Sequence, residues 1–381
     1  MKRYLFIFLA VAAMAASCAK TEIRSAREDH AITFIAANYA TKAPEVTGSV
    51  FPTSESFGVY AWTDGTEGTY FMDDEVVSFV AAESLWKPST TYYWPKYATV
   101  DFFCFYPTSL DAYLTPGETQ FTISGFDAVA SQVDVMYADK AVGFTDNQDL
   151  VSDGVNGYTG VPAFFRHALA KIKVNVVLPY YKKTADDGTE YEWTVSVKNF
   201  SLNNVYGKGD VTLDLSDLSA TGRVAWNKPA GNVWTPDGST TSFSNPAVTE
   251  LSSDAPYVVL DETYVLPQNL SAGAQQISLD ITIATKRNGA AFLTENVSRT
   301  IDLCLPDISL TAWEMNHLIV YNIILTPTAS TGNGGTPYDP TDPSDPDRPD
   351  PEDPDLDDVT ITFDPAVDDW DPITITGSIA I

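Results

Sequence analysis

The sequence predicts an all-β protein made of antiparallel β-sandwiches, and three observations lead to this class. Several short segments alternate apolar and polar residues with the period of two of a half-buried strand, most clearly 171–177, 210–215 and 277–285. Asp-Gly dipeptides, which favour tight turns, begin at positions 64, 153, 187 and 237. No long stretch keeps a helical period, so antiparallel sandwiches are favoured over a parallel α/β sheet.

Residues 1–17 have the layout of a secretion signal. A basic start at Lys2 and Arg3 precedes an apolar run that is too short to span a bilayer. Small residues then lead into Cys18, as in the signal box of bacterial lipoproteins, where the cysteine thiol takes a diacylglycerol and becomes the new N-terminus. We therefore expect Cys18 to carry a lipid anchor that includes palmitate. An ordinary signal followed by a chance cysteine is the alternative.

Two further cysteines, Cys104 and Cys304, lie in apolar, strand-like runs. They could form a disulfide in an oxidising compartment, or each could be a buried free thiol. The sequence leaves both arrangements open.

The chain after the signal divides by composition into two halves and a tail. Residues 43–165 are rich in aromatic side chains and 166–327 are plainer, so we expect one β-sandwich from each. A glycine-rich and then Asp/Pro-rich linker follows at 328–358, and residues 359–381 form the C-terminal tail.

The acidic composition bears on the choice of partner. The formal net charge is −29, and residues 339–358 alone hold nine aspartates, one glutamate and one arginine. The remaining charge makes a solvated acidic surface. Nucleic acid and anionic lipid are therefore disfavoured as partners.

No residue pattern indicates catalysis, a cofactor or a metal site. His30, His167 and His317 are the three histidines, and none has a second histidine or a cysteine at zinc-ligand spacing. The sequence contains no nucleophile elbow, phosphate-binding glycine loop or HExxH motif. We therefore expect no enzyme activity, although the abundant carboxylates leave a pair suited to glycoside hydrolysis open.

Four aromatic residues of the first half allow two interpretations. Trp86, Tyr92, Tyr93 and Trp94 could form a platform on which sugar rings stack. They could instead fill the core of a sandwich, where each aromatic side chain buries a large area. We favour the core.

The last residues have the pattern of an isolated strand. Ile373, Ile375, Ile379 and Ile381 fall on one face of an extended chain. Such a strand at a free end is an aggregation hazard unless a sheet edge receives it. We expect a donor strand that completes the sandwich of another subunit. The alternative is a tail that folds back on its own second domain.

Five segments, taken in order, resemble the fimbrillin family, the lipoprotein pilins of type V fimbriae in Bacteroidales. They are SLWKPSTTYYWP at 84–95, VDFFCFYP at 100–107, FFRHALAKIKV at 164–174, TYVLPQNL at 263–270 and WEMNHLIVYNIIL at 313–325. Each is a packing motif and not a catalytic one. The likeness covers the chain from about Ile32 to Leu325.

The resemblance implies two transthyretin-like β-sandwich domains in a lipoprotein of the outer membrane and cell surface, with other fimbrial subunits as partners. It also implies that a trypsin-like protease removes the first strand, within 18–42, and that the C-terminal strand of another subunit fills the open groove. Lys42 is then the candidate cleavage site, with Arg24 and Arg27 as alternatives. The long acidic linker before the tail departs from the family pattern.

Two functions are therefore considered. The first is a structural or tip subunit of a surface fimbria, without catalysis, that mediates adhesion to a ligand on a host or bacterial surface. The second is a glycan-binding surface lipoprotein that presents its aromatic residues to polysaccharide. Both agree with a lipid anchor and β-sandwiches, but only the first explains the terminal strand.

Overall fold

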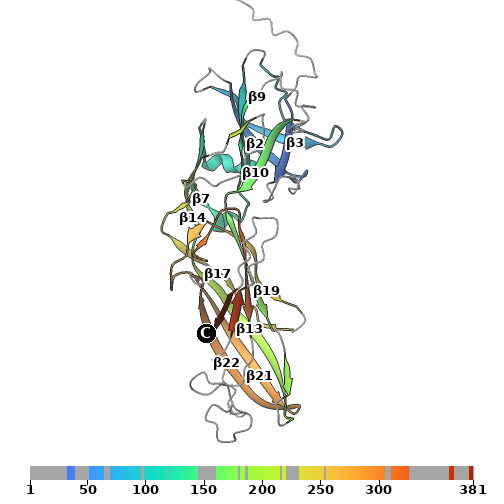
Figure 1. Ribbon diagram of the computed structural model, residues 1–381, viewed down its shortest axis with the longest axis vertical. Coiled ribbons are helices and arrows are strands. Elements are labelled where there is room, and N and C mark those ends of the chain that lie inside the picture. Colours follow the sequence, from blue (N-terminus) through green and yellow to red (C-terminus); the bar gives the residue numbers. More distant parts are fainter. Residues whose placement is uncertain are drawn as a thin grey trace, which may run out of the picture.

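The protein was analysed as a computed structural model, which describes residues 32–38, 51–63, 69–95, 98–117, 119–144, 160–178, 181–184, 188–214, 217–219, 231–252, 255–304, 310–325, 360–363 and 377–380. Strands dominate these residues, with one short 3₁₀-helix and one short α-helix among them. The predicted all-β class is therefore confirmed. The molecule is elongated, with β2, β3 and β9 near one end and β13, β21 and β22 toward the other (Figure 1).

The described elements of the first half are strands of three to eleven residues and two short helices. The strands are β1 (Phe34–Asn38), β2 (Ser56–Thr63), β3 (Tyr70–Val80), β4 (Leu85–Pro88), β5 (Val100–Tyr106), β6 (Leu114–Pro116), β7 (Gln120–Asp127), β8 (Met136–Ala138), β9 (Lys140–Phe144) and β10 (Val161–His167). The 3₁₀-helix η2 (Thr108–Tyr113) and the helix α2 (Ala128–Ser131) lie between strands. The Asp127 carboxylate caps α2, because it accepts a hydrogen bond from Ala130 N at 2.8 Å.

The second half contains longer strands. They are β11 (Ala170–Val177), β12 (Lys182–Thr184), β13 (Glu190–Tyr206), β14 (Lys208–Asp214), β15 (Asp217–Ser219), β16 (Thr235–Pro236), β17 (Thr240–Asn245), β18 (Thr249–Glu250), β19 (Tyr257–Val265), β20 (Gln268–Asn269), β21 (Gln276–Arg287), β22 (Ala290–Asp302), β23 (Ala312–Trp313) and β24 (Leu318–Ile324). The three segments predicted from alternation are β11, β14 and β21. Two of the predicted Asp-Gly turns carry glycines with positive φ, Gly188 at 84° and Gly238 at 90°.

The first half forms a sheet that returns on itself. Its strand order is β15-β9-β5-β2-β3-β4-β1-β10-β8, and β8 also pairs with β5. Strands β5, β2, β3, β4, β1, β10 and β8 therefore make a closed ring. The ring encloses a core of mainly aromatic side chains that includes Phe34, Phe57, Trp86, Phe102 and Phe165.

The second half is a sandwich of two sheets. One sheet has the order β19-β11-β24, and the other has the order β12-β13-β21-β22, with β17 and β18 also paired to β13. Alternate residues of β11, β13 and β21 point into one mainly aliphatic core, which includes Ile172, Val174, Val195, Leu279 and Ile281. The alternation seen in the sequence is thus the inner face of this sandwich.

Some strands from beyond residue 166 pair with strands of the first half. β14 pairs antiparallel with β7 in a sheet of order β16-β14-β7-β6, and β15 pairs parallel with β9. The predicted boundary between 43–165 and 166–327 therefore separates strands that share sheets in the folded chain. The division itself stays a prediction.

The chain passes from β10 to β11 through residues 166–170, and we call this crossing with its contacts the joint. One buried apolar cluster continues through it, with Phe103 and Phe121 from the first half and Leu266 and Met315 from the second. Trp234 Nε1 also donates a 2.7 Å hydrogen bond to the carbonyl oxygen of Ala168. The two halves therefore share buried structure at the joint.

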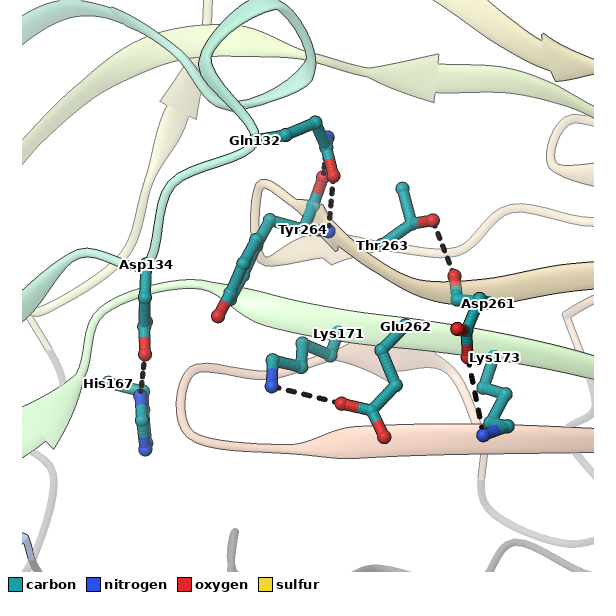
Figure 2. Close-up of polar contacts among 9 residues, drawn as sticks. All are labelled: Gln132, Asp134, His167, Lys171, Lys173, Asp261, Glu262, Thr263 and Tyr264. Atoms are coloured by element: carbon teal, nitrogen blue, oxygen red, sulfur yellow. Dashed lines mark hydrogen bonds and ion pairs between the residues drawn. The ribbon is translucent and has the colours of Figure 1, made fainter. Parts of the chain in front are cut away.

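Polar groups also link the halves at the joint (Figure 2). Gln132, which ends α2, donates to the carbonyl oxygen of Tyr264 at 3.0 Å and accepts from Tyr264 N at 3.1 Å. Nearby, His167 Nδ1 lies 2.8 Å from Asp134 Oδ2. Burial raises the pKa of Tyr264, and the Asp134 carboxylate raises it further. These contacts fix α2 and the end of β10 against β19.

Candidate strand-acceptor site

The first strand occupies a distinctive position in the ring. β1 lies between β4 and β10, parallel to β10 and antiparallel to β4. Its five residues pair with β10 from Phe34 opposite Val161 to Asn38 opposite Phe165. Because β1 is the strand that joins β4 to β10, its removal would open the ring at this point. We call the space that β1 fills the slot.

The first residue of β1, Phe34, and Ile32, two residues before it, point into the core of the ring. Ile32 and Phe34 are each 2% exposed. The Phe34 ring meets the rings of Phe57 and Phe102 edge-on, with centroid distances of 5.9 and 5.6 Å. Burying side chains of this size contributes roughly 1.5–3 kcal/mol each, and edge-on aromatic pairs add about 0.5–1.5 kcal/mol each. Packing is therefore a large part of what holds β1.

Backbone hydrogen bonds hold the same end of β1 from both sides. Ile32 N donates to the carbonyl oxygen of Tyr92 at 2.9 Å, and Val161 N donates to that of Thr33 at 2.7 Å. Successive residues of the strand are thus bonded to opposite walls of the slot.

A glycine lets the wall of the slot approach the strand closely. A Cβ atom at Gly160 would lie 2.8 Å from Thr33 O and 2.9 Å from the carbonyl carbon of Phe34, both of which are backbone atoms. Backbone atoms of a paired strand cannot move aside as a flexible side chain can. Position 160 therefore requires glycine for a strand to sit fully in the slot.

The floor of the slot is aromatic and extends past β1. Phe51 is fully buried, and its ring lies 4.8 Å from Phe165, 5.4 Å from Trp86 and 5.5 Å from Tyr106 between centroids. Phe51 belongs to the same core as Phe34. The chain is therefore anchored in this core on both sides of the segment that contains Lys42.

The structure separates the four aromatic residues considered as a sugar platform. Trp86 is 5% exposed in the core, Tyr92 packs on Phe71, and Trp94 meets Phe102 edge-on at 5.8 Å. Tyr93, in contrast, is 37% exposed. Three of the four rings therefore pack against core residues, as the favoured interpretation states.

Most of the residues predicted as sites lie outside the described part of the chain. These are Cys18, Lys42, Ile373, Ile375 and Ile381, together with the alternatives Arg24 and Arg27. Lipidation, cleavage and donation at these residues stay predictions.

The described part of the tail consists of two short strands. β25 (Thr360–Phe363) and β26 (Gly377–Ala380) pair antiparallel, with Ile361 opposite Ile379. β25 also lies beside β24 of the second half. The structure therefore places this hairpin next to its own second sandwich, which is the location named in the alternative for the tail.

The two remaining cysteines are free. Cys104 is buried in β5, and burial raises the pKa of its thiol. The structure therefore has two free thiols, of which Cys104 is buried as expected and Cys304 is only partly buried.

Comparisons with protein families and with solved structures place the chain among known proteins. The family model described as fimbrillin-like matches residues 41–337, which is most of the sequence. The chain belongs to the fimbrillin-like family. The resemblance seen in the sequence is therefore confirmed. No curated protein matches this sequence.

Solved structures similar to this fimbrillin-like chain include fimbrial proteins. A fimbrial protein from Bacteroides vulgatus shares 15% identity over 78% of this chain and 95% of its own, with a TM-score of 0.49. The fimbrial anchor protein Mfa2 from Porphyromonas gingivalis shares 14% identity over 78% and 90%, with a TM-score of 0.30. A fimbrial protein from Bacteroides ovatus shares 12% identity over 81% and 55%, with a TM-score of 0.32.

No helix among the described residues has the length and apolarity needed to cross a membrane.

Two residues that shape the slot carry no recognisable signal in the sequence. Gly160 lies in no turn motif. Glu75, which accepts hydrogen bonds from Ser89, Thr90 and Tyr92 beside the slot, is one of many acidic residues. Their roles depend on contacts with segments distant in the sequence, which alternation and spacing do not report.

Proposed function

We propose that this fimbrillin-like chain is a structural or tip subunit of a cell-surface fimbria and that it assembles by donor-strand exchange. The observation that carries the proposal is the position of β1, which closes the ring of the first half and precedes every other described strand. A strand with this position can be separated from the domain by one cut on its C-terminal side. The slot then becomes a receiving edge for a strand from another copy.

The position of Lys42 fits such a cut better than the two alternatives do. Lys42 lies after Asn38, where β1 ends, and before Phe51, where the chain re-enters the core. Cleavage after Lys42 would leave β1 held only by packing and hydrogen bonds. Cleavage after Arg24 or Arg27 would leave β1 covalently attached.

The C-terminal strand is the proposed occupant of the emptied slot. Ile373, Ile375, Ile379 and Ile381 would lie on one face of this strand in an extended chain. Burial of four such side chains would supply on the order of 6–12 kcal/mol before the costs of ordering. The donor must also leave its place near its own second half, where the hairpin of β25 and β26 lies.

The same cut would release the subunit from its anchor. We propose that Cys18 is lipidated and holds the uncut chain in the outer membrane, with no catalytic role for the folded domains. Other fimbrial subunits are the proposed partners, and the assembled fimbria would mediate adhesion.

Limited trypsin treatment of the full chain tests this proposal. We expect a resistant core that begins at Ala43, followed by ladders of polymers in native gels. The matched control is Lys42→Gln with Arg24 and Arg27 intact, which should be cut in the leader without polymerising. Deletion of 372–381 should leave the melting transition of the monomer unchanged and abolish the ladders. Polymerisation of the deleted chain, or a core that begins within the second half, would contradict the proposal.

A further inference from the structure

The segment that follows β4 forms the first contact of the strand in the slot. Tyr92 O accepts the 2.9 Å hydrogen bond from Ile32 N, one residue before Thr33 is bonded to Val161 on the opposite wall. On the β4 side, the described ladder with β1 contains one residue pair, Phe34 opposite Trp86. Tyr92 O is therefore an important fixed point for the strand along that wall.

One buried carboxylate organises this segment. Glu75 lies on β3 and is 9% exposed. Its Oε1 accepts hydrogen bonds from Ser89 Oγ at 2.5 Å and from Thr90 N at 2.8 Å, and its Oε2 accepts from Tyr92 OH at 3.1 Å. Bonds to an ionised carboxylate are stronger than neutral ones. Glu75 therefore fixes both the backbone and the side chains of residues 89–92.

The opposite wall and the core also restrict where the strand can lie in the slot. Gly160 leaves no room for even a Cβ atom against the backbone of Thr33 and Phe34. A slip of one residue would turn every buried side chain to the other face of the sheet. A slip of two residues would keep the faces but would move the Phe34 ring away from Phe57 and Phe102.

We propose that Glu75 is a positioning residue that sets the register of the strand in the slot, both for β1 and for the C-terminal strand of a second copy that replaces it. Glu75 contacts neither strand. It acts through Tyr92 O. Because Glu75 holds the segment that contains Tyr92, this acceptor oxygen meets the strand at one fixed position along the slot. The part of this inference that concerns the second copy rests on the proposed function.

Amide hydrogen exchange in the full, uncut chain tests the effect on β1. In Glu75→Ala, the amide of Ile32 should exchange about tenfold faster, the effect of losing one hydrogen bond. Glu75→Gln keeps an acceptor oxygen and should restore most of the protection. Glu83→Ala is the matched control, because Glu83 lies on the same hairpin, pairs with Lys87 and does not contact residues 89–92 in the described structure. An unchanged Ile32 amide, or equal acceleration at Val59 and Phe103, would overturn the proposal.

Cross-linking in trypsin-induced polymers tests the effect on the second copy. A Val161→Cys acceptor would be mixed with donors that carry Ile373→Cys, Ile375→Cys or Gly377→Cys, all with Cys304→Ser. With Glu75 present, one donor position should cross-link. With Glu75→Ala in the acceptor, two donor positions that lie two residues apart should each cross-link to the acceptor cysteine. Glu75→Gln should restore cross-linking at a single donor position. A single position in every variant would overturn the inference. If the parent chain forms no polymer, the proposed function fails, and the exchange measurement still decides the role of Glu75 toward β1.

Discussion

Apolar packing holds both the slot and the joint, but the joint adds hydrogen bonds from side chains to distant backbone groups. In the slot, β1 and the residues just before it contribute the apolar side chains of Phe34 and Ile32 and a short run of backbone pairing. In the joint, side chains bond to distant backbone groups, as Gln132 does at Tyr264 and Trp234 does at Ala168. The slot therefore holds β1 without side-chain hydrogen bonds in the described contacts, whereas the joint depends on particular side chains.

The difference suggests which part of the molecule can be exchanged. Apolar pockets and main-chain bonds accept any strand with large apolar residues at the right spacing. The contacts of the joint are specific to residues of the same chain, and among them Arg166 and Asp139 form a buried ion pair with two hydrogen bonds, at 2.6 and 3.0 Å. Under the proposed function, a subunit built in this way would exchange β1 while its two halves stay together.

The largest expected effect comes from breaking the buried ion pair of the joint. Asp139→Ala leaves the Arg166 guanidinium, 2% exposed, without its carboxylate. Because an unpaired buried charge is costly, we expect a loss of about 3–5 kcal/mol in the free energy of unfolding. Urea denaturation measures this loss.

Glu262→Ala is the control for that measurement, since the Glu262 side chain is 42% exposed in its pair with Lys171 (Figure 2). Its cost should stay below about 1 kcal/mol. Equal losses for the two variants would remove the distinction between buried and exposed pairs at the joint.

An intermediate effect is expected in the slot. Phe34→Leu keeps an apolar side chain but loses the edge-on contacts with Phe57 and Phe102. Two such contacts amount to about 1–3 kcal/mol. After cleavage, β1 should therefore leave the slot faster, which mass spectrometry of the released peptide would measure. The second half should unfold as in the parent chain, and a change there would show that slot and joint are not separable.

The smallest effect concerns Tyr106, which lies in the floor of the slot and is influenced by the charge of Asp134 at the joint. Its ring packs on Phe51 in the floor of the slot, and its hydroxyl donates to Glu55 at 3.1 Å. Burial, the bond to Glu55 and the charges of Glu55 and Asp134 raise the pKa of Tyr106 to about 12. Because the folded state favours the protonated phenol, the stabilisation is complete below pH 10 and is lost as the pH rises toward about 12.

Tyr106→Phe should therefore lose less stability between pH 10 and 12 than the parent chain does. Urea midpoints across this interval give the measurement. Identical alkaline losses in the two proteins would mean that Tyr106 does not titrate in the folded state as stated.

Much of the fold could be predicted because its signals are local. Alternation over six to nine residues located β11, β14 and β21, since it reports which face of a strand is buried. Gly188 and Gly238 adopt the positive φ that their Asp-Gly turns favour. The pairing of β14 with β7 and of β15 with β9 was not predictable in this way, because strand partners far apart in the sequence leave no mark in either strand.

The candidate site divides in the same way. The sequence by itself determined that apolar strands lie near both ends of the chain and that an acidic, proline-rich tract precedes the last one. Only the tertiary structure decided that β1 closes a ring between β4 and β10, that Gly160 must lack a side chain and that Glu75 holds residues 89–92. The reason is physical. The alternation that predicts a strand depends on residues one and two positions apart. The slot lies between β4 and β10, which are far apart in the sequence and come together only in the folded chain.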